Sequence, residues 1–228
     1  MSQTFMQKYR HRWRKSLLLI GGGSELGEAI AKAFAQSRFK KWEVLSVDEK
    51  PNPKATKNLI IKPEEALDQA RMEEVHKEVQ DFTEELSAII NITEAKDTMP
   101  ELTFKSADIF EEYEKVKNTE MRATLLTAHM AATYLSANGY VCFSSTVDAL
   151  RHLKVDSKTL EPQGNNLVYR ALKMAELQTG LNMAGSRGFE ELLYANATVN
   201  VLIWDKLNTM DNKKKYPNMN YTEWPHPD

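Results

Sequence analysis

Short apolar runs alternate along the chain with longer segments in which apolar residues recur at helical spacing. Six runs are rich in aliphatic and β-branched side chains, the composition typical of buried strands. They lie at residues 16–20, 42–47, 58–62, 86–92, 139–145 and 197–204. Helical segments are predicted between most of them, at residues 25–38, 63–82, 106–136 and 167–184. This alternation predicts an α/β fold built on a doubly wound parallel sheet.

Two of the helical segments carry further signals. Pro63 stands where the second helix is predicted to begin, and proline is favoured in a first helical turn because its missing N–H is not needed there. Within residues 106–136, four apolar side chains recur at helical spacing and are predicted to face the core: Met121, Leu125, Leu126 and Met130.

Composition narrows the class of protein. With 228 residues the chain can form one domain with a substantial core, which we expect to span residues 16–228. A net charge of -2 gives no electrostatic reason to expect nucleic acid, and no apolar run approaches the roughly 20 residues of a membrane span. Cys142 is the only cysteine, which excludes an internal disulfide. The five histidines lack ligand spacing, so no metal site is predicted.

Residues 1–15 form a basic arm before the first strand. No acidic residue occurs there, and aromatic residues interleave with five basic ones: Lys8, Arg10, Arg12, Arg14 and Lys15. An arginine-rich, acid-poor start is typical of a mitochondrial targeting segment, so we expect a mitochondrial protein, with a cytoplasmic one as the alternative. The arm is otherwise a solvated lead-in to the first strand, or a docking arm for an acidic partner.

The segment LLLIGGGSELGEAIAKAF combines an apolar strand, a glycine turn and an amphipathic helix. Gly21 and Gly22 permit a tight turn, and Gly27 permits close packing of helix on strand. The helix N-terminus then offers N–H groups to a pyrophosphate. Asp48 ends the next strand, where a carboxylate accepts hydrogen bonds from a ribose 2′-OH and repels a 2′-phosphate. The pattern predicts a dinucleotide site that prefers NAD(H) to NADP(H).

Two features weaken this site. Glu25 occupies the position at which a middle glycine lets the backbone approach the phosphates. Its carboxylate either complements the macrodipole of the helix or repels the pyrophosphate. The chain also has only 9 glycines among 228 residues, well below the usual level of about 7 %. Close approach of a backbone to a nucleotide needs glycine, so the shortage indicates that some approaches have been lost.

Tyr169 and Lys173 stand four residues apart in the last predicted helix, so both side chains lie on one helical face. An ammonium at this spacing favours loss of the phenol proton and can hold a cofactor ribose, which would let Tyr169 pass a proton. Ser145 ends the preceding strand and adds a hydroxyl. The same spacing recurs at Tyr113 and Lys117, where we expect solvated surface.

A glycine turn, a strand-end serine and a Tyr-x-x-x-Lys pair, in this order, resemble the short-chain dehydrogenase/reductase family. The resemblance covers nearly the whole chain and is strongest to the dihydropteridine reductase branch. It rests there on WEVLSVDE, on GYVCFSSTVDAL and on the late segment VNVLIWDKLNTMDNKKKYPNMNYTEW. The resemblance implies a Rossmann-like fold.

The resemblance also assigns roles to residues. It implies Tyr169 as the proton donor, Lys173 as the ribose-binding cation and Ser145 as the substrate-orienting serine, although the dihydropteridine reductases lack that serine. It implies an NAD(H) site made of these residues: Gly21, Gly22, Gly27 and Asp48, with Thr209 near the nicotinamide.

The chain departs from this family at several places. NITEAKD follows the fourth strand where a glycine-containing turn is expected, and Ile203-Trp204-Asp205 replaces a proline-containing turn after the sixth. A polar insertion separates Ser145 from Tyr169. The chain stops at NYTEWPHPD, where a dihydropteridine reductase continues through a helix and a final edge strand. We therefore expect a C-terminally shortened sheet whose sixth strand is covered by a partner.

These observations leave two functions open. The first is a degenerate NAD(H)-binding protein retained as an accessory or structural subunit of a larger assembly, whose other subunits cover the sheet edge. The second is an active NADH-dependent reductase of quinonoid dihydropterin, or of a similar small carbonyl or imine substrate, which would form a homodimer. The sequence favours the first because Glu25 and the altered turns are then explained. NADP(H), or no cofactor at all, remains an alternative to NAD(H).

Overall fold

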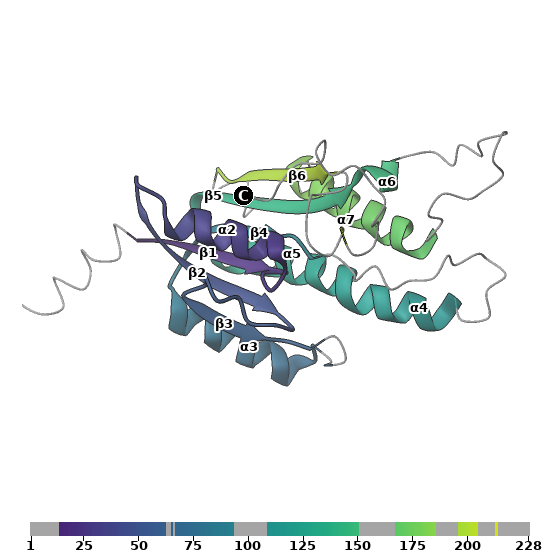
Figure 1. Cartoon of the computed structure of the whole chain (residues 1–228), viewed down its shortest axis with the longest axis horizontal. Helices are drawn as coiled ribbons and strands as arrows, with labels where there is room; N and C mark the ends of the chain where they lie inside the picture. Colours follow the sequence, from purple (N-terminus) through teal and green to yellow (C-terminus); the bar gives the residue numbers. More distant parts are fainter. Residues whose placement is uncertain are drawn as a thin grey trace, which may run out of the picture.

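One parallel sheet organises the protein (Figure 1). The computed structural model describes residues 14–62, 65, 67–93, 109–150, 167–185, 196–204 and 213. The strands are β1 (Arg14–Ile20), β2 (Lys41–Asp48), β3 (Lys57–Ile60), β4 (Leu86–Asn91), β5 (Leu135–Thr146) and β6 (Thr198–Trp204). Their order is β3-β2-β1-β4-β5-β6, and every neighbouring pair is parallel. This confirms the predicted doubly wound α/β fold.

Helices connect most of the strands. They are α2 (Glu25–Ala35), α3 (Gln69–Phe82), α4 (Ile109–Val116), a π-helical turn η1 (Lys117–Met121), α5 (Arg122–Tyr134), α6 (Val147–Leu150) and α7 (Leu167–Gly185). The segments α4, η1 and α5 follow one another without a break. None of the described helices is long and apolar enough to cross a bilayer.

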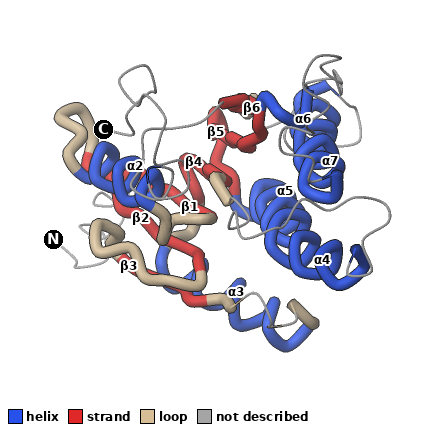
Figure 2. The backbone as a smooth tube through the Cα atoms, turned by 45° about the vertical axis from the view of Figure 1, so that its right-hand side comes forward, coloured by secondary structure: helices blue, strands red, loops and turns tan. Residues whose placement is uncertain are grey.

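The two faces of the sheet carry separate cores. On one face, α3, α5 and α7 pack against the strands through a large cluster that includes Val79, Met130 and Met183. On the other face α2 packs through Ala31 and its neighbours. Figure 2 shows α2 on one side of the strands, with α5 and α7 on the other. Because both faces are covered, β1 is a continuous apolar run rather than an alternating one.

The carboxyl ends of β1, β4 and β5 lie beside one another in the middle of the sheet. In open α/β sheets, ligands bind outside these ends, where the strand order reverses. Here the order reverses between β1 and β4. The glycine turn follows β1, Thr93 lies just after β4, and Ser145 lies at the end of β5, so the fold gathers the predicted site residues at this edge.

Within the described part of the chain, β6 pairs only with β5. Val199 and Val201 pack against the core of the α7 face. Leu202 and Ile203 are large apolar residues that remain 50 % and 38 % exposed. The chain beyond Trp204, on which the expectation of a shortened sheet depends, lies outside the described residues apart from residue 213.

Two predictions about the helices are wrong. The second helix begins at Gln69 instead of Pro63, because Asp68 caps it by accepting a hydrogen bond from the N–H of Arg71. Leu125, predicted to face the core, is 60 % exposed, whereas Leu126 and Met130 are buried as expected. A helix presents only one stripe to the core, and Leu125 lies outside it.

Candidate functional site

The glycine turn after β1 is packed too tightly for side chains. Gly21 has a φ of 83°, and a Cβ added there would lie 2.6 Å from the backbone nitrogen of Thr93. A Cβ on Gly27 would lie 2.4 Å from the carbonyl oxygen of Gly22. A Cβ on Gly22 itself would lie 2.3 Å from the hydroxyl of Ser46. The turn therefore needs these glycines for its own packing, whether or not it holds a nucleotide.

Ser24 sets the start of α2. Its hydroxyl accepts a hydrogen bond from the N–H of Gly27 at 3.1 Å and donates one to the carbonyl of Gly21 at 3.0 Å. Glu25 is consequently the first helical residue, with its carboxylate in the first turn. That position stabilises the helix through its macrodipole. It also places a negative charge at the helix end that would receive a pyrophosphate.

Asp48 is held against the glycine turn. Its carboxylate accepts hydrogen bonds from the N–H of Gly23 at 2.9 Å and of Glu49 at 2.6 Å. The N–H of Lys50 also approaches Oδ1 at 3.4 Å, whereas Oδ2 accepts only the bond from Gly23 among the described residues and keeps a lone pair for a ribose hydroxyl. The adenosine end of a dinucleotide therefore fits the donor and acceptor set present here.

Asn52 completes this turn and was not predicted from the sequence. Its side chain is fully buried, and its amide donates to the carbonyls of Gly22 at 2.8 Å and Gly27 at 3.1 Å. The loop after β2 is thereby hydrogen-bonded to both ends of the glycine turn. In the sequence Asn52 lies in PNPKATKN, which has only the signature of a turn.

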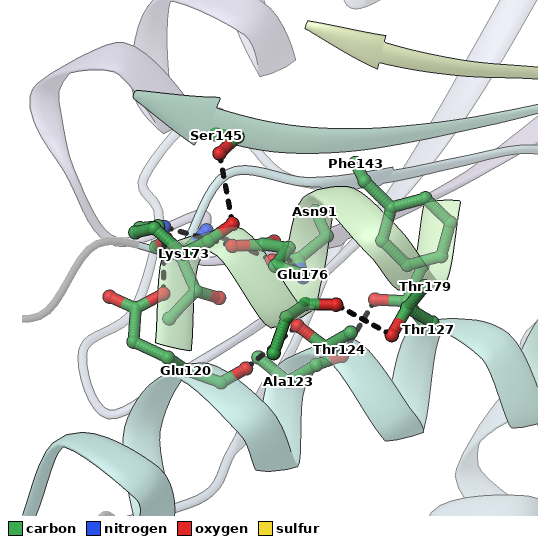
Figure 3. A network of polar contacts seen from close by, with 12 residues as sticks. Asn91, Glu120, Ala123, Thr124, Thr127, Phe143, Ser145, Lys173, Glu176 and Thr179 are labelled. Carbon is green, nitrogen blue, oxygen red and sulfur yellow. Dashed lines mark hydrogen bonds and ion pairs between the residues drawn. The ribbon is translucent and has the colours of Figure 1, made fainter. Parts of the chain in front are cut away.

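Lys173 on α7 lies in the interior of the protein (Figure 3). Its Nζ lies 2.8 Å from the carbonyl oxygen of Thr93, 2.7 Å from Glu120 Oε2 and 3.0 Å from Glu176 Oε2. A lysine ammonium has three N–H donors, and three acceptors surround it. The residue predicted to hold the nicotinamide ribose is only 2 % exposed; it donates hydrogen bonds to Thr93 and Glu176 and forms an ion pair with Glu120.

Glu120 reaches Lys173 from the π-helical turn η1. This turn widens the helix between α4 and α5, and Glu120 is 1 % exposed within it. Single π-turns are rare and occur frequently at functional sites. This contact could not be predicted from the sequence, because a glutamate that follows three polar residues in KNTEM is typical of a solvated helix face.

Glu176 closes the cluster from the next turn of α7. It accepts a hydrogen bond from the side-chain amide of Asn91 at 3.0 Å and is fully buried. Burial raises the pKa of Glu176 to about 8, with Glu120 adding to the shift and Lys173 opposing it. Burial alone would lower the pKa of Lys173, but the charges of the two carboxylates outweigh it and raise that pKa. Two carboxylates thus share one ammonium inside the protein.

Ser145 lies at the end of β5 and faces α7 (Figure 3). Its hydroxyl is buried and donates to the backbone carbonyl of Lys173 at 3.0 Å. The contact ties the strand to the helix. It also occupies the donor that would orient a substrate.

Tyr169 lies one helical turn before Lys173, and the ammonium is 5.8 Å from the centre of its ring. The ring is partly buried against a small cluster that contains Val116 and Leu172. The structure thus brings Tyr169, Lys173 and Ser145 to one end of α7, and their catalytic roles stay predictions. Thr209 lies outside the described residues.

The fold matches solved short-chain dehydrogenases over most of both chains. A short chain dehydrogenase from Salmonella enterica serovar Typhi superposes with a TM-score of 0.72 at 13 % identity, covering 94 % of this chain and 85 % of that one. A short chain dehydrogenase family protein from Francisella tularensis gives 0.69 at 14 %, with 94 % and 86 % covered. Neither a family model nor a curated protein sequence matches the chain. At these identities the likeness establishes the fold, a Rossmann-like sheet of the short-chain dehydrogenase type.

Proposed function

We propose that this protein is a degenerate relative of the short-chain dehydrogenases, most similar to the dihydropteridine reductase branch, that no longer transfers hydride. The main support for this proposal is that the ammonium of Lys173 is buried and held by three groups of this chain. A ribose would have to displace Thr93, Glu120 or Glu176 from it. A carboxylate displaced in this way would remain buried without its counterion, which costs several kcal/mol.

The adenosine end of the site supports retained binding of NAD(H). Asp48 keeps its carboxylate beside the turn, and the glycines keep the backbone close to α2. A bound dinucleotide would supply hydride chemistry only if its nicotinamide end were also held. Asp48 disfavours a 2′-phosphate, so NADP(H) is the weaker candidate. Glu25 opposes the pyrophosphate of either, so we expect binding to be weak.

An accessory role in a larger, mitochondrial assembly rests on the sheet edge and on the basic arm. β6 leaves Leu202 and Ile203 half exposed, and exposed apolar strand edges in soluble proteins are normally covered. The acid-poor start of the chain is consistent with import or with docking on an acidic subunit. Native-size measurement from the source tests this role. A particle far larger than a dimer of the 26.1 kDa chain is expected, and a simple homodimer would contradict it.

The second candidate is an active NADH-dependent reductase of quinonoid dihydropterin or a related imine or carbonyl. The placement of Tyr169 one turn from Lys173 favours it, because a phenol beside an ammonium can donate a proton. In that reaction Tyr169 would hold the proton and Lys173 would orient it.

Turnover separates the two candidates. Purified full-length protein is mixed with NADH and quinonoid dihydropterin, and NADH oxidation is followed by absorbance. We expect no rate above the protein-free reaction. A clear rate that disappears in Tyr169→Phe would establish the reductase instead, because this change removes only the phenol oxygen.

A further inference from the structure

Two histidines from different helices meet on the α3 and α5 side of the sheet. His76 lies on α3 and His129 on α5, and their Nε2 atoms are 3.0 Å apart. The ring centres are 5.0 Å apart and the rings are nearly perpendicular. His129 is exposed and His76 is partly buried, so solvent reaches the pair. The two residues are 53 positions apart in the chain, which is why ligand spacing could not reveal them.

Tyr134 orients one of these rings. Its hydroxyl lies 2.7 Å from Nδ1 of His76, on the opposite side of the ring from His129. If Nδ1 carries the proton and donates it to the Tyr134 oxygen, Nε2 of His76 presents a lone pair toward His129. Metal-binding histidines are fixed in this way, by a hydrogen bond from the nitrogen that does not touch the metal.

We propose that His76 and His129 bind a divalent transition-metal ion of the zinc or copper class, which ties α3 to α5. With metal–nitrogen bonds of about 2.0–2.1 Å, two imidazole nitrogens on one ion lie about 2.9 Å apart at a right angle and about 3.3 Å apart in a tetrahedron. The separation of 3.0 Å falls within this range. The spacing of the two nitrogens therefore suits one shared ion, which would take the place of the hydrogen bond between them.

The chemistry of the pair selects the class of metal. Imidazole suits zinc, copper and nickel, whereas calcium and magnesium prefer oxygen ligands. Among the described residues no group of three or more His, Cys, Asp and Glu side chains could hold a metal. The ion would thus keep water on its remaining positions, and its affinity would be below that of a four-ligand structural site.

Zinc titration of the chelator-treated full-length chain tests the proposal by calorimetry. To isolate the pair, all measurements use a background in which the other three histidines are replaced: His11→Ala, His152→Ala and His226→Ala. We expect one zinc ion per chain. His129→Ala and His76→Ala should each weaken binding at least tenfold, and Tyr134→Phe by about tenfold through loss of the orienting contact. A Cu²⁺ electron paramagnetic resonance spectrum should show two coupled nitrogens.

The same titration can also contradict the proposal. If the background chain binds zinc no more tightly than His129→Ala does, the two imidazoles only share a hydrogen bond. Unfolding curves of each variant show whether it is folded like the background chain. His129→Gln, at an exposed position, provides a second variant that removes the imidazole. The test is independent of nucleotide binding, so its failure would leave the proposed function untouched.

Discussion

Glu120 and Lys173 form a buried ion pair, with Glu120 Oε2 2.7 Å from Lys173 Nζ. The side chains of these two residues are 0 % and 3 % exposed. A cation that serves a cofactor must offer at least one N–H to it. Lys173 also donates hydrogen bonds to the carbonyl of Thr93 and to the carboxylate of Glu176, so groups of this chain surround its ammonium.

Replacing Lys173 with methionine should destabilise the protein. The change leaves two buried carboxylates without their counterion, and breaking a buried pair in this way costs roughly 3–5 kcal/mol. Urea denaturation measures the loss in the free energy of unfolding.

Lys117 offers a matched control for this change. It follows Tyr113 at the same spacing, is partly exposed and pairs with Glu114. Lys117→Met should therefore cost at most about 1 kcal/mol. If Lys173→Met were equally mild, the buried cluster would not contribute to stability as described.

Glu176 should make stability depend on pH. Its pKa is about 8 in the folded protein against an ordinary 4.5, so between these values the folded state binds a proton that the unfolded state has released. The free energy of unfolding should therefore fall as the pH rises from about 5 to about 8. Glu176→Gln cannot titrate and keeps an acceptor for Asn91, so its stability should change less over this range. Denaturation at both pH values measures the difference, and identical pH dependence in the two proteins would contradict this account.

Gly27→Ala should be destabilising although it replaces glycine in a helix. In a helix, alanine ordinarily stabilises the protein by about 1 kcal/mol relative to glycine. The added Cβ, however, would lie 2.4 Å from the Gly22 carbonyl oxygen, and such overpacking costs about 1–3 kcal/mol. Ala33→Gly, on the exposed face of the same helix, reports the ordinary propensity difference in this protein. A Gly27→Ala protein that is more stable than the natural chain would show that the turn is loosely packed.

Local patterns predicted the elements that define the fold. Three signals follow one another directly in the sequence: the apolar run of β1, the glycines after it and the apolar spacing of α2. Local sequence alone therefore predicts these elements. The common face of Tyr169 and Lys173 followed from helical periodicity alone. The start of α3 was misplaced because a proline is permitted in a first turn but does not require one, whereas the hydrogen bond to Asp68 fixes it.

The partners of Lys173 could not be predicted, because they come from separate elements. Thr93 follows β4, Glu120 lies on η1, and only the packing of α7 against both brings their oxygens to one point. A π-helical turn has no sequence signature that would direct Glu120 inward. The burial of Asn52 likewise depends on how the loop after β2 folds onto the glycine turn.

The affinities of NADH and ADP for the purified full-length protein show whether the nicotinamide half of a dinucleotide is held. Both contain the adenosine diphosphate half that Asp48 and the glycine turn would hold, and only NADH adds the ribose that Lys173 would have to bind. We expect NADH to bind no more tightly than ADP. Tenfold tighter binding of NADH, worth about 1.4 kcal/mol, would show that the nicotinamide half is held and would contradict this expectation.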